Sequence, residues 1–401
     1  MTTSQTRRLA SITTWSSGGT PNRTRDEYWN GTIPWISAAT LKGSRIGGSD
    51  QHLTEAGLRA GSKLAPKGAT LVLVRGMALH RETRIGLAQL PVSFNQDVKA
   101  LVPKAGILPE FLLYALQARS GQIRELVSSA GSGTGVLNTQ LLQRLPIWVP
   151  SEETQQLIVE AMSDTDDLIA TLERLITKKQ AIKQGMMQQL LTGRTRLPGF
   201  DDEWCQSTVG REFDIQLGKR LDAAVNRGEF KTCINNRAVR WGRIMLGEAI
   251  EAPLTDADIQ TLRLVPGDVL MCEGGEIGRS AVWRGELTEA YFLNTLHRLR
   301  SNGEFDPYLL VAYFQRRIET GELSAVIGKA TLAHLTKENL VQIPIPMPSR
   351  DEQVQLAAVL KDADNELDML GSRLAKARAI KTGMMQQLLT GRTRLPVEAS
   401  S

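Results

Sequence analysis

Apolar residues recur at helical spacing in two stretches of the chain that lie 198 positions apart. Within each stretch they step by alternating intervals of four and three residues, which is the heptad spacing of a coiled coil. The pattern predicts two long helices, each with one narrow apolar seam. Because the simplest partner for each seam is the other one, and a folded domain separates them, we expect an antiparallel pair. The first seam comprises Ile158, Met162, Thr165, Ile169, Leu172, Ile176, Lys179 and, after a slip, Met186 and Leu190.

Residues at both ends of these stretches predict where the helices begin and stop. Ser151 and Ser349 each follow a proline and are suited to cap a helix N-terminus. Gly193 and Gly391 are each followed by Arg-Thr-Arg-Leu-Pro and are typical stop signals. About 42 helical residues at 1.5 Å each would make rods of roughly 60 Å.

The end of each seam belongs to a nearly identical repeat. Residues 181–198 read AIKQGMMQQLLTGRTRLP, and residues 379–396 differ from them only by Thr382 in place of Gln184. The chain is therefore a tandem duplication with divergent fronts and similar rears. We expect two globular fronts at 1–150 and 198–348, helical segments at 151–197 and 349–396, and a tail at 397–401.

The fronts have mixed patterns that predict α+β folding. Short buried strands are predicted at residues 69–74 and 268–272, and helices opened by proline at residues 109–117 and 307–317.

Paired methionines inside the repeat indicate a second role for the helices. A seam needs one apolar residue at this point, whereas two adjacent methionines face different sides. Coiled-coil packing alone is the simpler interpretation of the seam, but the near-identity of the copies favours two identical partner subunits docking on equivalent surfaces. The predicted partner-binding residues are Met186, Met187, Gln188, Gln189, Met384, Met385, Gln386 and Gln387.

Charge is distributed unevenly although the whole chain carries only +5. Residues 1–150 hold 17 basic and 8 acidic residues, and residues 201–348 hold 17 basic and 21 acidic ones. The first front therefore has the stronger electrostatic reason to bind a polyanion. Its candidate DNA-binding residues lie in Gly- and Ser-rich loop sequence and are Arg23, Arg25, Lys42, Arg45, Arg75, His80, Arg81 and Arg84.

Between positions 219 and 243 the second front has seven basic residues and only two acidic ones. Two adjacent amides there are of the type that reads adenine edges, as arginine reads guanine. A solvated basic face is the competing interpretation for each single residue. The candidates are Lys219, Arg220, Arg227, Lys231, Asn235, Asn236, Arg237, Arg240 and Arg243.

Signals of catalysis or metal binding are nearly absent. The three cysteines and four histidines have no metal-ligand spacing. The GSGTG run at residues 131–135 lacks the Lys-Ser/Thr of a phosphate loop, so a turn is the better interpretation. The chain has no long apolar run and no leader pattern at its start, which predicts a cytoplasmic protein. We expect a binding protein without a cofactor or metal of its own.

At this point the sequence resembles the specificity subunit of a type I restriction-modification system. The resemblance rests on GGTPNR at residues 18–23 with IPWIS at 33–37, on FDIQLGKRL at 213–221, on LPGFDDEW at 197–204, and on the doubled MMQQLLTGRTRLP. It implies that the fronts are two target recognition domains, each reading half of a split double-stranded DNA target. It further implies a non-catalytic subunit on which two methyltransferase subunits dock and which restriction subunits join. S-adenosylmethionine and ATP would then be bound by those partners.

A different class remains open: a scaffold whose coiled coil gathers two identical partners without reading DNA. If the helices instead set the distance between two recognition domains, residues inserted before Gly193 should lengthen the unread spacer of the target and leave both half-sites unchanged.

Overall fold

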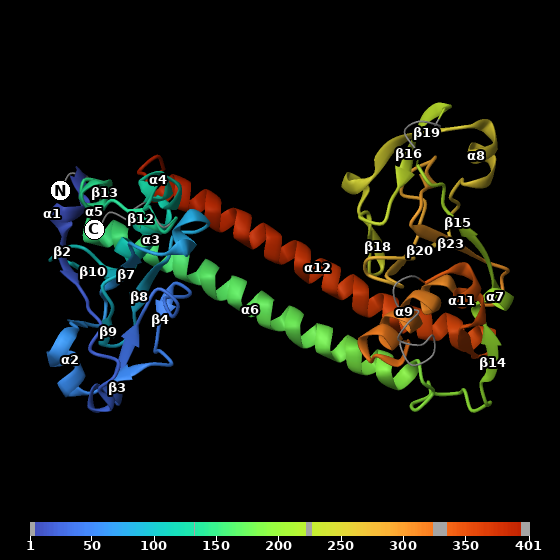
Figure 1. The fold of residues 1–401 in the computed structure, drawn as a ribbon, viewed down its shortest axis with the longest axis horizontal. Coiled ribbons are helices and arrows are strands. Elements are labelled where there is room, and N and C mark those ends of the chain that lie inside the picture. Colours follow the sequence, from blue (N-terminus) through green and yellow to red (C-terminus); the bar gives the residue numbers. More distant parts are fainter. Residues whose placement is uncertain (1–4, 132, 222–226, 324–334, 394–401) are drawn as a thin grey trace, which may run out of the picture. The chain divides into compact units, whose positions relative to one another are not determined.

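The computed structural model describes residues 5–131, 133–221, 227–323 and 335–393. The chain divides into two compact units: unit 1 is Met1–Glu173 with Ser372–Ser401, and unit 2 is Arg174–Gly371. Two helices of 39 residues each, α6 (Glu152–Leu190) and α12 (Arg350–Leu388), contribute one part to each unit. Both units are α+β, as expected (Figure 1).

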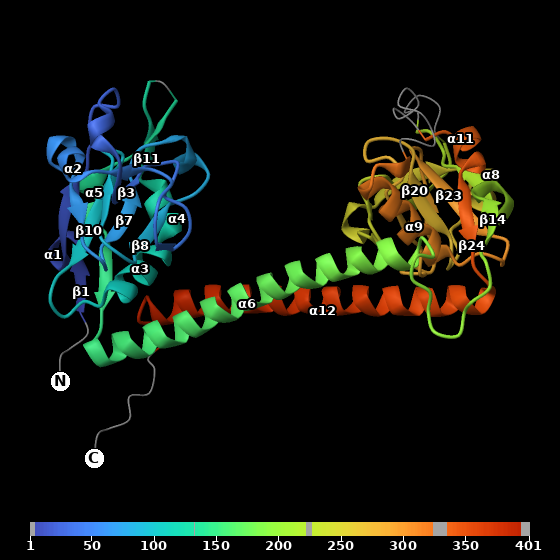
Figure 2. The same ribbon diagram turned by 90° about the horizontal axis from the view of Figure 1, so that it is seen from below.

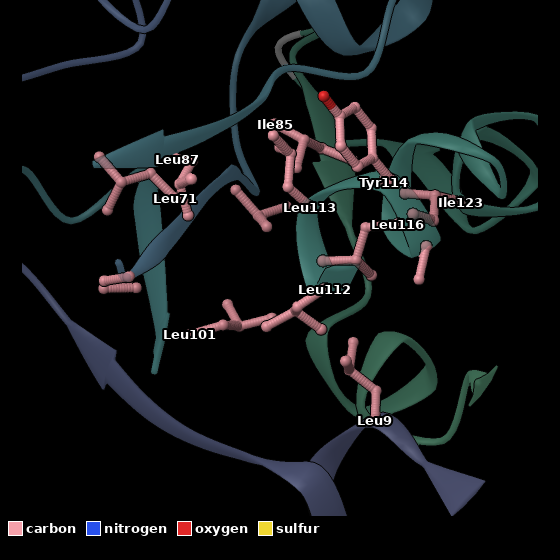
Figure 3. Close-up of a cluster of buried hydrophobic side chains, with 14 of the residues drawn as sticks. Leu9, Leu71, Ile85, Leu87, Leu101, Leu112, Leu113, Tyr114, Leu116 and Ile123 are labelled. Atoms are coloured by element: carbon pink, nitrogen blue, oxygen red, sulfur yellow. The ribbon is translucent and has the colours of Figure 1, made fainter. Parts of the chain in front are cut away.

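Unit 1 is built on a five-stranded sheet with the order β2-β10-β7-β8-β4. Helix α3 (Pro109–Gln117) packs against β7 and β8, and its apolar face closes the core (Figures 2 and 3). Leu112 and Leu113 of α3 are buried together with Leu71 and Leu101 from the sheet. The strands are β2 (Thr13–Ser17), β4 (Arg45–Ile46), β7 (Thr70–Leu73), β8 (Ile85–Ala88) and β10 (Val98–Pro103).

Smaller elements complete unit 1. A four-stranded sheet has the order β5-β3-β9-β6, and β1 pairs with β13 and β11 with β12. The strands are β1 (Gln5–Arg8), β3 (Trp29–Ile36), β5 (His52–Leu53), β6 (Leu64–Ala65), β9 (Val92–Phe94), β11 (Val127–Ser129), β12 (Gly135–Leu137) and β13 (Pro146–Val149). The helices are α1 (Leu9–Ile12), η1 (Asp26–Tyr28), α2 (Glu55–Gly61), η2 (Met77–His80), α4 (Ser120–Glu125) and α5 (Thr139–Gln143).

Unit 2 repeats the two larger sheets in the same chain order, but its β17–β18 pair comes between β16 and β19, whereas β11–β12 of unit 1 follows α4. Its main sheet runs β15-β23-β20-β21, its second sheet β19-β16-β22, and β14 pairs with β24 and β17 with β18. The strands are β14 (Cys205–Thr208), β15 (Phe213–Leu217), β16 (Glu229–Ile234), β17 (Val239–Arg240), β18 (Arg243–Ile244), β19 (Ile250–Leu254), β20 (Val269–Cys272), β21 (Ser280–Val282), β22 (Tyr291–Phe292), β23 (Leu296–Ser301) and β24 (Pro344–Met347). The helices are α7 (Val209–Glu212), η3 (Leu246–Glu248), α8 (Asp256–Thr261), α9 (Pro307–Glu319) and α11 (Lys337–Gln342).

The predicted elements of the fronts are present with small shifts in their ends. Strands β7 and β20 lie within the two predicted runs, α3 spans the predicted range, and α9 extends two residues beyond it. The glycines at 18 and 218 are required for close approach: a Cβ at either would come within 2.5 Å of the carbonyl oxygen of Phe94 or Leu293. The duplication is thus visible in the fold as well as in the repeat.

The long helices are capped at both ends as the sequence predicts. The Ser151 hydroxyl accepts from the Thr154 N–H, and the Ser349 hydroxyl accepts from the Glu352 N–H. Gly193 and Gly391 have φ values of 69° and 74°, the left-handed region that ends a helix at low cost for glycine. A serine cap and a glycine stop therefore bound each helix.

The helices meet antiparallel within each unit. In unit 1, Lys381 of α12 pairs with Asp166 of α6 at 2.5 Å, and Tyr114 donates to the same carboxylate at 2.9 Å. In unit 2 the lysine comes from α6 and the carboxylate from α12. Lys183 pairs with Asp364 at 2.5 Å, and Tyr308 donates to the Asp364 carboxylate. The seam positions of both helices are buried or half-buried. Equivalent carboxylates, 198 residues apart, thus hold the same contact in each unit.

Two glutamines that the sequence did not single out fasten the helix starts to the units. Gln155 is fully buried; it accepts from the Leu108 N–H and donates to the carbonyls of Gly106 and Pro150. Gln353, its equivalent at +198, is also fully buried and makes the same three contacts with Asp306, Glu304 and Pro348. These contacts fasten the first turn of each helix to its unit.

The nearly identical repeat packs into the chain's own cores. Met187, Leu190 and Leu191 belong to the core of unit 2, and Leu388 and Leu389 to that of unit 1. Met186, Met384 and Met385 are half-buried against the same cores. The expectation that Met187 faces a partner is wrong, because 1% of its surface is exposed. Intramolecular packing accounts for part of the identity between the copies.

Candidate nucleic-acid interface

The connection between β7 and β8 gathers four of the predicted DNA-binding residues. Residues 74–84 form an 11-residue loop containing η2, and it carries Arg75, His80, Arg81 and Arg84. Arg75, His80 and Arg81 are exposed, and Arg84 is half-buried. Glu82 is the one acidic residue in the loop. Three arginines against one glutamate give it a positive charge of two, with His80 beside it.

Neighbouring segments hold this loop on several sides. The Gly76 N–H donates to the Gly135 carbonyl at 3.0 Å, and the Leu137 N–H donates to the Val74 carbonyl at 2.9 Å, which ties the loop to the β11–β12 hairpin. The His80 Nε2 lies 2.9 Å from the Gly133 carbonyl oxygen. The hairpin turn falls in the GSGTG run, as predicted, and Ser132 within it lies outside the described residues. The loop is therefore ordered by backbone bonds.

The Arg84 side chain is held by two contacts within unit 1. Its guanidinium donates to the Ala38 carbonyl at 2.6 Å and pairs with Glu82 at 2.7 Å. The first bond joins the loop to residues 37–44, where Lys42 is exposed. We therefore expect Arg84 to shape this surface, with Arg75, Arg81 and Lys42 facing a ligand.

The remaining basic candidates of unit 1 lie on other segments. Arg23 stands over the rings of Trp29 and Trp35, with its guanidinium carbon 5.2 and 5.3 Å from their centroids. Arg25 is exposed and pairs with Glu27 at 3.3 Å. Arg45 donates to the Ser163 hydroxyl of α6 at 3.1 Å. These three residues stay predictions, but the structure does not bring them into the loop at 74–84.

In unit 2, two of the predicted cations are engaged with carboxylates. Lys219 pairs with Asp258 at 2.5 Å, and Lys231 pairs with Glu229 at 2.9 Å and Glu289 at 3.3 Å. Burial raises the pKa of Asp258, but hydrogen bonds from Lys219 and Thr255 outweigh it and lower that pKa overall. The pairing neutralises two of the seven cations that the sequence places between positions 219 and 243.

Asn235 is not available to read a base. It is 8% exposed, its Oδ1 accepts from the Arg237 and Ala238 N–H groups, and its Nδ2 donates to the Glu248 carbonyl. The amide shapes a turn, so the prediction of an adenine-reading role for it is wrong. Asn236 beside it is half-buried, and its carbonyl accepts from Arg279 at 2.7 Å. Its side chain stays a candidate.

The exposed arginines of unit 2 stay candidates for contact with DNA. Arg243 lies 3.9 Å from Asp368 with both side chains 65% exposed, a separation and exposure at which an ion pair adds little. Arg240 donates to the Arg237 carbonyl at 2.7 Å. Arg240, in β17, is exposed, and so are three further arginines of this stretch: Arg220, Arg227 and Arg237.

The equivalent loop in unit 2 has the opposite charge. Residues 273–279 connect β20 to β21 and read EGGEIGR. Arg279 is 9% exposed and its guanidinium pairs with Glu276 at 2.6 Å. The same position in the two sheets thus carries a longer basic loop in unit 1 and a shorter acidic one in unit 2. The sequence analysis named the basic residues of the first loop and did not single out the second, whose equivalence appears only from the strand order.

The glutamines of the repeat are the exposed part of the predicted partner surface. Gln188, Gln189, Gln386 and Gln387 are exposed. Gln189 and Gln387 also accept from the hydroxyls of Thr195 and Thr393, so each helps to close the end of its helix. Gln188 and Gln386 stay the clearest candidates for partner contact.

The described residues contain no group of three or more His, Cys, Asp or Glu side chains placed to hold a metal ion. Within the same ranges, no helix has the length and hydropathy needed to cross a membrane. All three cysteines are free thiols, two of them buried. The fold thus presents two α+β units with equivalent sheets and with unlike loops at the same place in each main sheet.

Comparison with known proteins places the chain in a family. The model of the type I restriction modification DNA specificity domain matches residues 1–184 and 257–377, and the chain belongs to this family. The EcoR124I/EcoR124II specificity subunit of Escherichia coli is 29% identical over 178 residues, which is 44% of this chain and 44% of that subunit. The putative MjaX specificity subunit of Methanocaldococcus jannaschii is 26% identical over 312 residues, 73% of this chain and 70% of that protein.

Solved structures share the fold over nearly the full length. The S subunit of a type I restriction-modification system from M. genitalium superposes with a TM-score of 0.61 at 14% identity, covering 96% of both chains. A chain from a type I restriction-modification complex gives a TM-score of 0.60 at 16% identity over 97% of this chain and 98% of that one.

Proposed function

We propose that this chain is the specificity subunit of a type I restriction-modification complex and reads a bipartite double-stranded DNA target. The observation that carries the proposal is the repetition of one fold with unlike loops at the same place, in a chain that belongs to this family. A binding protein that reads two different half-sites needs a common scaffold and independent reading surfaces. The two β-hairpin loops, one basic and one acidic, fit that need.

Each unit acts as one target recognition domain. In unit 1 the loop at 74–84 contributes phosphate contacts through Arg75 and Arg81, which position the domain on the duplex without reading sequence. In unit 2 the exposed arginines between positions 220 and 243 do the same. The acidic loop at 273–279 suits contact with the amino group of cytosine, for which carboxylates are the usual acceptors.

The long helices form an antiparallel coiled coil, and the chain is an internal pseudo-twofold repeat. The equivalent contacts of Asp166 and Asp364 with lysine and tyrosine support this, as does the exchange of helix roles between them. Two methyltransferase subunits dock on the helices near Gln188 and Gln386, and restriction subunits join the assembly. The chain itself is non-catalytic and cytoplasmic, and S-adenosylmethionine and ATP bind to the partner subunits.

The test is DNA binding by the chain purified together with its methyltransferase. Methylome sequencing of the host with and without the gene identifies the target, and a gel shift compares duplexes with each half-site scrambled in turn. Loss of preference on scrambling either half supports the proposal. A complex whose sequence preference is the same without this chain would identify it as a scaffold that gathers partners.

Salt dependence then separates the two roles assigned to arginines in the loop. Arg81→Ala should reduce the slope of log K against log salt by about 1, because one phosphate contact is lost. Arg84→Ala is the matched control, since its guanidinium is bound to Ala38 and Glu82; it should leave the slope unchanged. Equal slopes for Arg81→Ala and the unmodified chain would show that Arg81 does not touch phosphate.

A further inference from the structure

An apolar side chain projects from the basic loop of unit 1. Met77, the first residue of η2, is 65% exposed, and among large apolar side chains of the described residues only Phe230 is more so, at 67%. A single exposed apolar side chain is ordinary on a protein surface, and the feature that sets Met77 apart is its place at the tip of a basic loop.

The loop presents Met77 in a fixed position. Its two flanks are bonded through Gly76 to Gly135 and through His80 to Gly133, and the Arg124 guanidinium donates to the Arg81 carbonyl at 3.3 Å. Gly76 has a φ of 148°, which side-chain-bearing residues rarely adopt, so the turn before Met77 depends on this glycine. A ligand that contacts Met77 therefore has little loop entropy to overcome.

Positive charge on both sides of Met77 indicates what the ligand is. Arg75 and Arg81 are exposed two and four residues away. Phe230 differs in this respect, because Glu229 and Glu289 neutralise the adjacent Lys231. An apolar tip flanked by cations matches a DNA groove, where apolar base surface lies between two rows of phosphates.

We propose that Met77 reads a thymine in the half-site of unit 1 by packing on its 5-methyl group in the major groove, while Arg75 and Arg81 hold the flanking phosphates. The methyl group of thymine is the apolar feature of base edges in that groove. A thioether side chain is flexible and polarizable, so it adapts to such a small apolar target. This proposal rests on the function proposed above and names one base that unit 1 reads.

The experiment uses the chain in complex with its methyltransferase and the target found by methylome sequencing. Each thymine of either half-site is replaced singly by uracil, which removes only the 5-methyl group, and Kd is measured by fluorescence anisotropy. At one thymine we expect the unmodified complex to bind the uracil duplex about four-fold more weakly. This factor corresponds to the loss of one buried methyl-sized group from the interface. Met77→Ala should bind the thymine and uracil duplexes equally at that position.

Controls separate this contact from general loss of binding. Leu64→Ala removes an apolar side chain that is 48% exposed elsewhere in unit 1, and it should keep the four-fold difference. Met77→Leu, which stays apolar, should keep most of it. Equal weakening of thymine and uracil duplexes by Met77→Ala, no effect of that variant, or a target without thymine would each overturn the proposal. A complex with no sequence preference would instead refute the proposed function itself.

Discussion

Replacing either of the paired glutamines Gln155 and Gln353 by leucine should destabilise the unit that holds it. Each is fully buried at the start of a long helix and makes three hydrogen bonds to backbone groups of its own unit. Substitution by leucine keeps the approximate volume and removes all three. At Gln155 the Leu108 N–H would lose its acceptor at 3.0 Å, and two carbonyls, at 2.9 and 3.1 Å, would lose a donor.

The cost follows from these three contacts. An unpaired buried donor costs about 1–3 kcal/mol, and each carbonyl hydrogen bond contributes about 1 kcal/mol net. The apolar leucine recovers part of this by burial, which leaves a destabilisation of about 2–4 kcal/mol. Because the contacts are local, we expect the loss in the unit that holds the glutamine.

Hydrogen exchange with mass spectrometry measures this unit by unit. A loss of 2 kcal/mol corresponds to exchange about 30-fold faster in the affected segment. Gln155→Leu should accelerate peptides around residues 104–112, and Gln353→Leu those around residues 302–310. The matched controls are Gln156→Leu and Gln355→Leu, at exposed neighbouring positions. If the buried and exposed substitutions gave the same exchange rates, the reasoning from buried hydrogen bonds would be refuted.

Three further outcomes follow from burial, ionisation and helix length. Leu389→Ala should destabilise unit 1 by about 2–5 kcal/mol, and Leu191→Ala should destabilise unit 2 by a similar amount. Leu168 is 47% exposed, so Leu168→Ala should change the free energy of unfolding little. Urea unfolding of the three variants checks these values. Burial and the neighbouring Asp166 raise the pKa of Tyr114 to about 12, so the folded state holds the phenol proton more tightly than the unfolded state does. The resulting contribution to stability is complete below pH 10 and disappears as the pH rises toward 12. Urea unfolding at pH 9 to 12 should show a smaller decline for Tyr114→Phe, and equal declines would contradict the assignment. Insertion of helical residues before Gly193 should lengthen the unread spacer of the target at about 1.5 Å per residue; methylomes with an altered half-site and the old spacer would refute it.

Much of the fold was predictable because the relevant signals are local. Heptad spacing marks the two helices, serine and glycine mark their ends, and proline marks the first turn of α3 and α9. Each of these signals depends on backbone conformation or on one face of one element. The binding site was less predictable, because the state of a charged side chain depends on its neighbours in space. Lys219 and Lys231 are basic in sequence and paired in the fold.

By itself the sequence determined that this protein is one unit used twice, with two capped helices and two unlike fronts. A repeat at a constant offset requires no tertiary information, because chain order alone reveals it. Only the tertiary structure decided which residues of the repeat are buried in the chain's own cores, as Met187 is, and which, like Gln188, face outward. It also showed that the Asn235 amide is already hydrogen-bonded to backbone groups of its own turn. The reason is physical: hydrogen bonds and burial join residues far apart in the chain, and a side chain already bonded within the fold has no free group to offer a ligand.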